Sequence, residues 1–146
     1  MVQEIINVVK RGIRGKEPLN IEKIHDMVEY AVEDISGVSS SQVEMQSGLQ
    51  FYDGMSTDEI QQILIKSAAD LISLENPNYQ YVAARLLLYS LRKQVIDKLW
   101  DHPHIYEHTK KCIEKGVYDP SILESYEKKD FDRMENWINH NRDYDF

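Results

Sequence analysis

The sequence contains a single cysteine, and it shows neither a long apolar run nor a targeting signal. Cys112 is the only cysteine among 146 residues, so neither a disulfide nor a cysteine-based metal site can form within the chain. No stretch approaches the roughly 18 apolar residues of a membrane-spanning helix. Glu4, Asn7 and Lys10 break up the early apolar run, which argues against a signal peptide. We therefore expect a cytoplasmic protein without membrane association, in the host cytoplasm if a phage encodes it.

Positive charge is also scarce, except at the start of the chain. The sequence has 17 Lys and Arg against 25 Asp and Glu, a net charge of −8, whereas general nucleic-acid binding needs a basic surface. We therefore expect no nucleic-acid partner. Residues 1–23, however, contain five bases and only three acids. This local excess indicates a small anion site, although a solvated hairpin tip has the same composition.

Motifs of known catalytic sites are absent. The sequence has no P-loop, nucleophile elbow or dinucleotide-binding glycine fingerprint. Cys112 lies on an expected helix, where a packing role is favoured over a reactive one. His102, His104 and His108 lie near Glu107, but His104 precedes the expected helix and no further ligand is evident. We therefore predict neither catalytic residues nor a metal site in this chain.

A helical pattern follows a short hairpin at the start of the chain. Residues 5–9 and 17–21 are predicted strands, and Gly12 and Gly15 allow a turn between them. Four helices follow, with apolar residues at steps of three and four. Their expected starts are Asn20, Ser41, Ser56 and Asn76. The pattern predicts a mainly α fold, a four-helix bundle capped by a small N-terminal β-sheet.

Two of these helices carry further expectations. Ser41 and Glu44 have the spacing of a capping box, after which Met45, Leu49 and Tyr52 are predicted to form the inner stripe of the second helix. The fourth helix, residues 76–93, is apolar on every side, which predicts burial at the centre of the bundle.

The helices become shorter beyond residues 102–103. Helical patterns at 105–115 and 130–139 flank a capped turn at 119–120. We therefore predict one domain at residues 1–100 and a helical segment at 101–146. The aromatic residues at the end of this segment would pack on another chain or fray.

The elements of an anion site are present, but the sequence does not bring them together. A glycine-bearing basic hairpin spans Lys10 to Lys16, helix N-termini are expected at Asn20 and Thr57, and Lys93 ends the fourth helix. Free N–H groups at helix N-termini bind phosphate, and lysines add charge. A nucleoside phosphate site is therefore possible if these elements meet.

Several motifs carry a resemblance that extends along essentially the whole chain. They are Leu-Asn-Ile-Glu-Lys-Ile-His at 19–25, Gln-Phe-Tyr-Asp-Gly at 50–54, Pro-Asn-Tyr-Gln-Tyr-Val-Ala-Ala-Arg-Leu at 77–86 and the closing Asn-Arg-Asp-Tyr-Asp-Phe. Through these motifs the chain resembles the N-terminal region of class I ribonucleotide reductase large subunits, beginning with the regulatory ATP-cone. The short helices would then lead into the catalytic barrel of that family.

The resemblance implies an allosteric function. ATP or dATP, bound with Mg²⁺, would control the reduction of ribonucleoside diphosphates to deoxyribonucleotides for DNA synthesis. The lysines among the implied site residues would face the phosphates, and the isoleucines would pack on the base, which Glu17 and Asn20 would hydrogen-bond. The site residues implied by position are Lys10, Arg11, Glu17, Pro18, Leu19, Asn20, Ile21, Glu22, Lys23, Ile24, Thr57, Ile60 and Lys93.

The chain also departs from the family pattern. Members that dATP strongly inhibits often carry histidines where this chain has Gln61 and Ser90, and the hairpin here is one residue longer. We therefore expect dATP inhibition to be weakened or lost.

The family's catalytic cysteines have no counterpart here, and Cys112 matches none of them. The resemblance implies that this chain acts only with a separate catalytic remainder of the large subunit and with the radical-generating small subunit, unless the chain is an excised domain. Residues 101–146 would form the docking part, with aromatic residues Tyr118, Tyr126, Phe131, Trp137 and Tyr144. The alternative is a non-catalytic interaction scaffold whose nucleotide binding has decayed. A cone attached to a transcriptional repressor would need a cysteine-rich zinc ribbon, which is absent.

Overall fold

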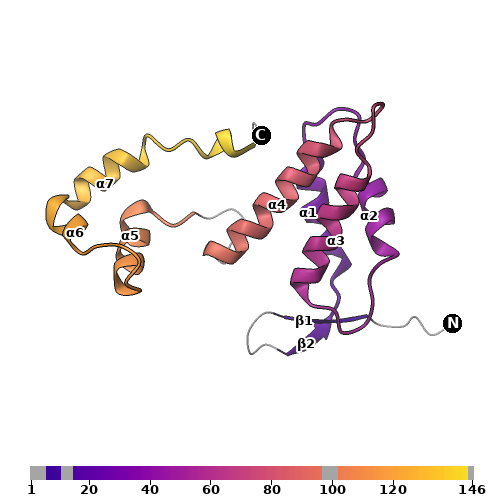
Figure 1. The fold of residues 1–146 in the computed structure, drawn as a ribbon, viewed down its shortest axis with the longest axis horizontal. Coiled ribbons are helices and arrows are strands. Elements are labelled where there is room, and N and C mark those ends of the chain that lie inside the picture. Colours follow the sequence, from indigo (N-terminus) through magenta and orange to yellow (C-terminus); the bar gives the residue numbers. More distant parts are fainter. Residues whose placement is uncertain (1–5, 11–14, 97–101, 145–146) are drawn as a thin grey trace. The chain divides into compact units, whose positions relative to one another are not determined.

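The computed structural model describes residues 6–10, 15–96 and 102–144, and it confirms a mainly α fold with a small N-terminal sheet (Figure 1). The chain divides into two compact units, Met1–Gln94 and Val95–Phe146. The first contains β1 (Asn7–Val9), β2 (Lys16–Pro18), α1 (Ile21–Val32), α2 (Ser40–Gly48) and α3 (Thr57–Asp70), and α4 (Tyr79–Ile96) ends at the boundary. The second contains α5 (Ile105–Glu114), α6 (Ser121–Ser125), α7 (Lys128–Glu135) and a 3₁₀-helix, η1 (His140–Tyr144).

Strands β1 and β2 form an antiparallel hairpin that is tied to the loop before α3. Val8 pairs with Glu17 at the middle of the ladder. On its other side, the Val9 N–H donates to the Met55 carbonyl at 2.9 Å, and the Gly54 N–H donates to the Asn7 carbonyl at 2.8 Å. β2 is shorter than predicted and ends at Pro18, because the chain turns into α1 directly after it.

Helix α1 begins directly after Asn20, its predicted cap. The Asn20 side-chain oxygen accepts a hydrogen bond from the Lys23 N–H at 3.0 Å, which satisfies one free donor of the first turn. One face is buried, as its apolar spacing predicts, and consists of Ile24, Met27, Val28 and Ala31. The helix ends at Val32. Shortly after it, Asp34 takes a left-handed conformation with φ 59°.

Helix α2 differs most from the sequence prediction. Its N-cap position is Ser39, so Ser41 lies inside the helix and the predicted capping box is wrong. The predicted inner stripe is also wrong, because the buried residues are Val43 and Ser47. α2 contacts both α1 and α3, and small residues let helix backbones approach closely. Met45, Leu49 and Tyr52 are instead 73%, 87% and 54% exposed, and the last two lie beyond the final residue of α2, Gly48.

Helix α3 confirms its predicted capping signal. The Glu59 N–H donates to the Ser56 hydroxyl at 3.2 Å, and the Ser56 N–H donates to the Glu59 carboxylate at 2.7 Å. This reciprocal pair satisfies two donors of the first turn. The inward face consists of Ile60, Leu64, Ser67 and Ala68.

Helix α4 is buried on one face and exposed on the other, so the prediction of burial on every side is wrong. Its buried face includes Tyr79, Val82, Leu86 and Tyr89, whereas Leu87, Leu91 and Val95 are exposed. The Tyr79 hydroxyl accepts from the Ser39 N–H at 3.1 Å and donates to Gln42. These bonds fix the start of α4 to the start of α2.

The second unit has a small aromatic core around Phe131. Phe131 is buried, with the Tyr106 ring edge-on at 5.3 Å and the Tyr126 ring at 6.5 Å. Phe131 is therefore a packing residue, and its predicted docking role is wrong. Tyr118 and Trp137 are exposed, and the Tyr144 side chain lies outside the described part of the chain. No helix in the described ranges is long and apolar enough to cross a membrane.

Candidate functional site

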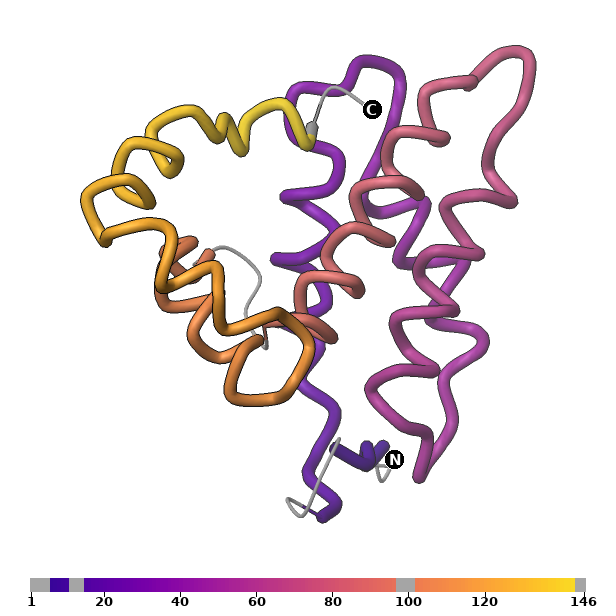
Figure 2. The backbone as a smooth tube through the Cα atoms, turned by 60° about the vertical axis from the view of Figure 1, so that its left-hand side comes forward, coloured from indigo at the N-terminus to yellow at the C-terminus, as the bar shows by residue number. Residues whose placement is uncertain are grey.

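The hairpin and the first turns of α1 and α3 lie at one end of the first unit (Figures 1 and 2). The Leu19 N–H, just before α1, donates to the Ile6 carbonyl at 2.8 Å. Val9 forms a parallel bridge with Ser56, the cap of α3. Two helix N-termini and the hairpin therefore converge, which the sequence spacing alone could not establish.

Lys10 and Glu17 form an ion pair across the hairpin. Their Nζ and Oε1 atoms are 2.6 Å apart, and both side chains are partly exposed. Both residues belong to the predicted site. Lys10 was expected to contact the phosphates, and Glu17 was expected to hydrogen-bond the adenine base. In the structure, Lys10 has the Glu17 carboxylate as its anionic partner.

Asp53 fixes the open end of the hairpin. Its carboxylate accepts from the Asn7 backbone N–H at 2.7 Å and from the Asn7 side-chain amide at 2.9 Å. These two bonds, with a smaller contribution from the charge of Lys16, hold the pKa of Asp53 below its usual value. The carboxylate is therefore ionised at neutral pH, and it keeps β1 against the loop before α3.

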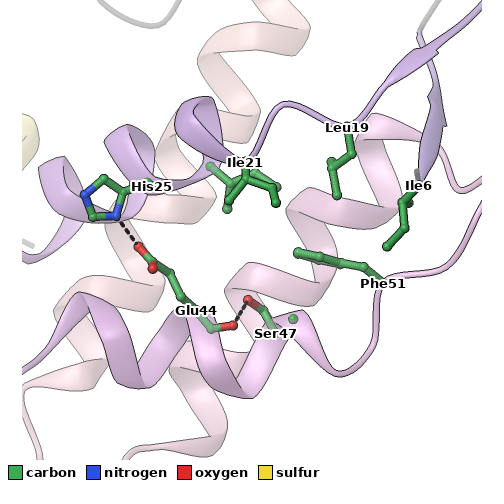
Figure 3. Close-up of a pocket in the computed structure, with 9 residues that line it drawn as sticks. Ile6, Leu19, Ile21, His25, Glu44, Ser47 and Phe51 are labelled. Atoms are coloured by element: carbon green, nitrogen blue, oxygen red, sulfur yellow. Dashed lines mark hydrogen bonds and ion pairs between the residues drawn. The ribbon is translucent and has the colours of Figure 1, made fainter. Parts of the chain in front are cut away.

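A mainly apolar pocket of about 220 Å³ lies between the start of α1, the end of α2 and β1 (Figure 3). Three predicted site residues, Leu19, Ile21 and Ile24, line it. The remaining lining residues were not among the predicted site residues. These are Ile6, His25, Glu44, Ser47, Gly48 and Phe51.

His25 and Glu44 form the polar side of this pocket (Figure 3). The His25 Nδ1 and a Glu44 carboxylate oxygen are 2.8 Å apart. The hydrogen bond to Glu44, followed by the attraction of its charge, raises the pKa of His25 above its usual value. Because α1 and α2 supply one residue each, the pair links the two helices that enclose the pocket.

The other predicted residues do not line this pocket. Thr57 is the half-buried first residue of α3, and Ile60 is buried one turn later. Lys93 is exposed in the last turn of α4, which runs toward the hairpin end of the first unit (Figure 1). Lys23 is exposed in the first turn of α1, and Pro18 and Glu22 are exposed as well. Arg11 lies outside the described residues.

Of the two positions that depart from the family pattern, Gln61 is half-buried on α3 and Ser90 is buried on α4. The Gln61 amide nitrogen contacts the Met27 sulfur at 2.9 Å, and its buried amide oxygen has no hydrogen-bond partner among the described residues. Ser90 is buried, with its hydroxyl 3.3 Å from the Gln94 amide nitrogen. Neither side chain can carry the positive charge of a protonated histidine.

Comparisons with known proteins identify the relatives of this chain. Residues 6–94 match the family model described as the ATP cone domain. Ribonucleoside-diphosphate reductase 1 subunit alpha of Escherichia coli (strain K12) is 45% identical over 130 residues, which cover 89% of this chain and 17% of that protein. The ribonucleoside-diphosphate reductase subunit alpha of Enterobacteria phage T4 is 38% identical over 146 residues, covering 98% of this chain and 19% of the relative. The chain thus spans less than a fifth of the length of the curated relatives that it matches.

Proposed function

Because the chain belongs to the ATP cone domain family, we propose that its first unit binds ATP, with Mg²⁺, as an allosteric effector of ribonucleoside-diphosphate reduction. The observation that carries this proposal is the convergence of the hairpin and two helix N-termini beside an apolar pocket. Helix N-termini attract phosphate, and an apolar pocket suits the base. Together they match the two chemically different halves of a nucleotide.

The adenine base enters the pocket in this proposal. The volume of about 220 Å³ is below the roughly 300–1,000 Å³ of sites that enclose a whole small ligand. The pocket therefore takes the flat base and leaves the ribose and phosphates outside. Leu19, Ile24 and Phe51 supply the apolar surface that packs on the base.

The phosphates then lie over the hairpin and the helix N-termini. Lys10 exchanges the Glu17 carboxylate for a phosphate oxygen, and the released carboxylate can accept a hydrogen bond from the adenine amino group. Lys23 and Lys93 add positive charge, and the Thr57 hydroxyl lies at the start of α3. Mg²⁺ would be held mainly by the phosphates themselves, as is usual for nucleotide-bound magnesium.

We further propose that dATP inhibits weakly or not at all. Gln61 and Ser90 are neutral, so neither position can add a cationic contact that a histidine would supply. The decisive measurement is the activity of the reconstituted reductase during a dATP titration. Full activity up to saturating dATP is expected, and shutdown by dATP would refute this part of the proposal.

The reductase partners are also part of the proposal. The relatives are reductase alpha subunits far longer than this chain. We propose that the second unit docks on a separate catalytic chain, and that the small subunit completes the enzyme. Exposed Tyr118, Tyr126 and Trp137 supply apolar contact surface.

Isothermal titration calorimetry of the chain with ATP and Mg²⁺ tests nucleotide binding. Phe51→Ala, which removes one wall of the pocket, should weaken binding. Leu49→Ala, two residues earlier but 87% exposed, is the matched control and should bind ATP as the unmodified chain does. Absence of heat with ATP, together with an intact complex with the catalytic chain, would favour the scaffold function instead.

A further inference from the structure

Two histidines and an aspartate from opposite ends of the second unit lie together. His102 precedes α5, whereas His140 and Asp143 belong to η1 near the end of the described chain. One potential ligand atom from each of the three side chains lies within 4.8 Å of the others. These residues lie outside the candidate nucleotide site, which is built from the first unit.

The three side chains form a compact cluster. The His102 and His140 rings are stacked, with centroids 4.0 Å apart and planes inclined by 2°. The His140 Nδ1 and an Asp143 carboxylate oxygen are 3.9 Å apart, which is too long for a hydrogen bond. Both of these side chains are about 40% exposed (41% and 39%), so an ion from solvent could reach them.

We propose that His102, His140 and Asp143 bind a divalent transition-metal ion, with Zn²⁺ as the best match. Zn²⁺ binds imidazole nitrogen and carboxylate oxygen at about 2.0–2.2 Å, and imidazole ligands favour it over Mg²⁺ or Ca²⁺. Ligand atoms at that distance from one ion lie roughly 3.3 Å apart in a tetrahedron. The atoms must therefore approach one another by roughly 1–1.5 Å.

The histidine rings supply most of this movement. An imidazole binds a metal in its own ring plane, and two parallel rings cannot share one ion, so the rings turn about χ2 when the metal binds. This torsion has broad, shallow minima. Three protein ligands leave the fourth position to water.

The bound ion would act as a structural clip. It joins the segment entering α5 to η1, a helix of five residues. Because the ion binds the folded state and not the unfolded chain, it stabilises the folded state by mass action. His102 is closer in sequence to His104 and His108, and no local pattern in the sequence links it to residues near 140.

The other two histidines have different partners. The His104 Nδ1 accepts from the Tyr106 N–H at 3.2 Å as the cap of α5, and its Nε2 lies 3.2 Å from Asp132. The His108 Nε2 lies 3.5 Å from the Cys112 sulfur. His108 and Cys112 are another pair of side chains in this unit that could bind a transition metal. Substitution of His108 is therefore the control for the proposed site.

The experiment is a titration of the full chain with Zn²⁺ in competition with a chromophoric chelator, and in parallel with Co²⁺ to record its d–d absorption. We expect one equivalent to bind, with a Co²⁺ spectrum typical of nitrogen and oxygen ligands. His102→Gln and His140→Gln should each weaken binding by more than about tenfold, as losing a metal ligand requires. His108→Gln should leave the affinity unchanged.

Thermal unfolding followed by circular dichroism provides a second readout. Zn²⁺ should raise the midpoint of the unmodified chain and of His108→Gln, but not of His140→Gln, whose metal-free spectrum should match that of the unmodified chain. The proposal would be overturned if the His102 and His140 variants bound Zn²⁺ as tightly as the unmodified chain, if His108→Gln lost binding, or if Co²⁺ gave sulfur-to-cobalt charge-transfer absorption.

Discussion

Asn20 has two separable roles, capping α1 and contacting the proposed nucleotide. Its side-chain oxygen accepts one hydrogen bond from the Lys23 N–H at 3.0 Å. The side-chain NH₂ group takes no part in that bond, and in the proposed complex it donates a hydrogen bond to the nucleotide. Asn20→Ala removes the oxygen and the NH₂ group together, whereas Asn20→Asp keeps an oxygen acceptor and removes only the NH₂ donor.

The cost of Asn20→Ala follows from the single bond that is lost. Replacing an N-cap residue by alanine costs about 0.5–2 kcal/mol, typically about 1 kcal/mol. Asn20 is exposed, so water can solvate the released N–H group, and we expect about 1 kcal/mol. For a unit of this size that lowers the unfolding midpoint by about 4–8 °C. Thermal unfolding by circular dichroism measures the shift.

Asn20→Asp should unfold at the temperature of the unmodified chain, because aspartate caps as well as asparagine and its charge suits a helix N-terminus. Its ATP affinity should fall about tenfold or more. The lost hydrogen bond and the new repulsion of the phosphates each cost on the order of 1 kcal/mol. Calorimetry with ATP and Mg²⁺ measures this loss.

Asn76→Ala is the matched control. Asn76 is exposed and lies before α4, which begins at Tyr79, so this substitution should change stability by less than about 0.5 kcal/mol. An unchanged midpoint for Asn20→Ala would refute the capping argument. Unchanged ATP affinity in Asn20→Asp would refute the contact between Asn20 and the nucleotide while leaving the cap intact.

Three further predictions concern packing and protonation. Tyr79→Phe removes two hydrogen bonds at the start of α4, so chemical denaturation should show a loss of about 1–3 kcal/mol. Phe131→Ala empties the core of the second unit and should cost about 3–5 kcal/mol, measured in the same way. An NMR pH titration should give His25 a raised pKa that returns toward its usual value in Glu44→Gln. The stabilisation from this pair is fully present below the unfolded-state pKa of His25 and is lost as the pH rises through the folded-state pKa.

Controls for the packing predictions lie close to the substituted residues. Tyr81→Phe changes an exposed tyrosine on the same helix as Tyr79 and should be nearly neutral. Trp137→Ala changes a side chain that is 73% exposed and should cost far less than Phe131→Ala. Equal losses within either pair would contradict the burial on which these predictions depend.

The sequence was sufficient to predict a helix start where the capping hydrogen bonds join residues that are close together in the chain. The Asn20 cap of α1 and the Ser56–Glu59 capping box of α3 were predictable, because their hydrogen bonds join residues only three positions apart. The buried face of α2 was not predictable. Met45 and Leu49 have helical spacing, but the contacts of α2 with two other helices decide which face is buried.

The candidate site was predictable only in part. Leu19, Ile21 and Ile24 belong to the continuous stretch that the resemblance implied, and they line the pocket. Phe51 and the His25–Glu44 pair complete the pocket from distant positions. No local pattern links these residues, and the capping-box interpretation had assigned Glu44 to the backbone. Their proximity follows from the packing of α1 against α2.

The ion pair between Lys10 and Glu17 has a consequence for ligand selectivity. The carboxylate is tethered to the same hairpin as the ammonium, 2.6 Å away, so it competes with incoming anions at the high effective concentration of an intramolecular partner. Chloride or inorganic phosphate, which gains nothing from the apolar pocket, displaces such a partner poorly. A nucleotide that fills the pocket as well can supply the missing free energy. The hairpin would thus be insensitive to the small anions abundant in a cell and responsive to whole nucleotides.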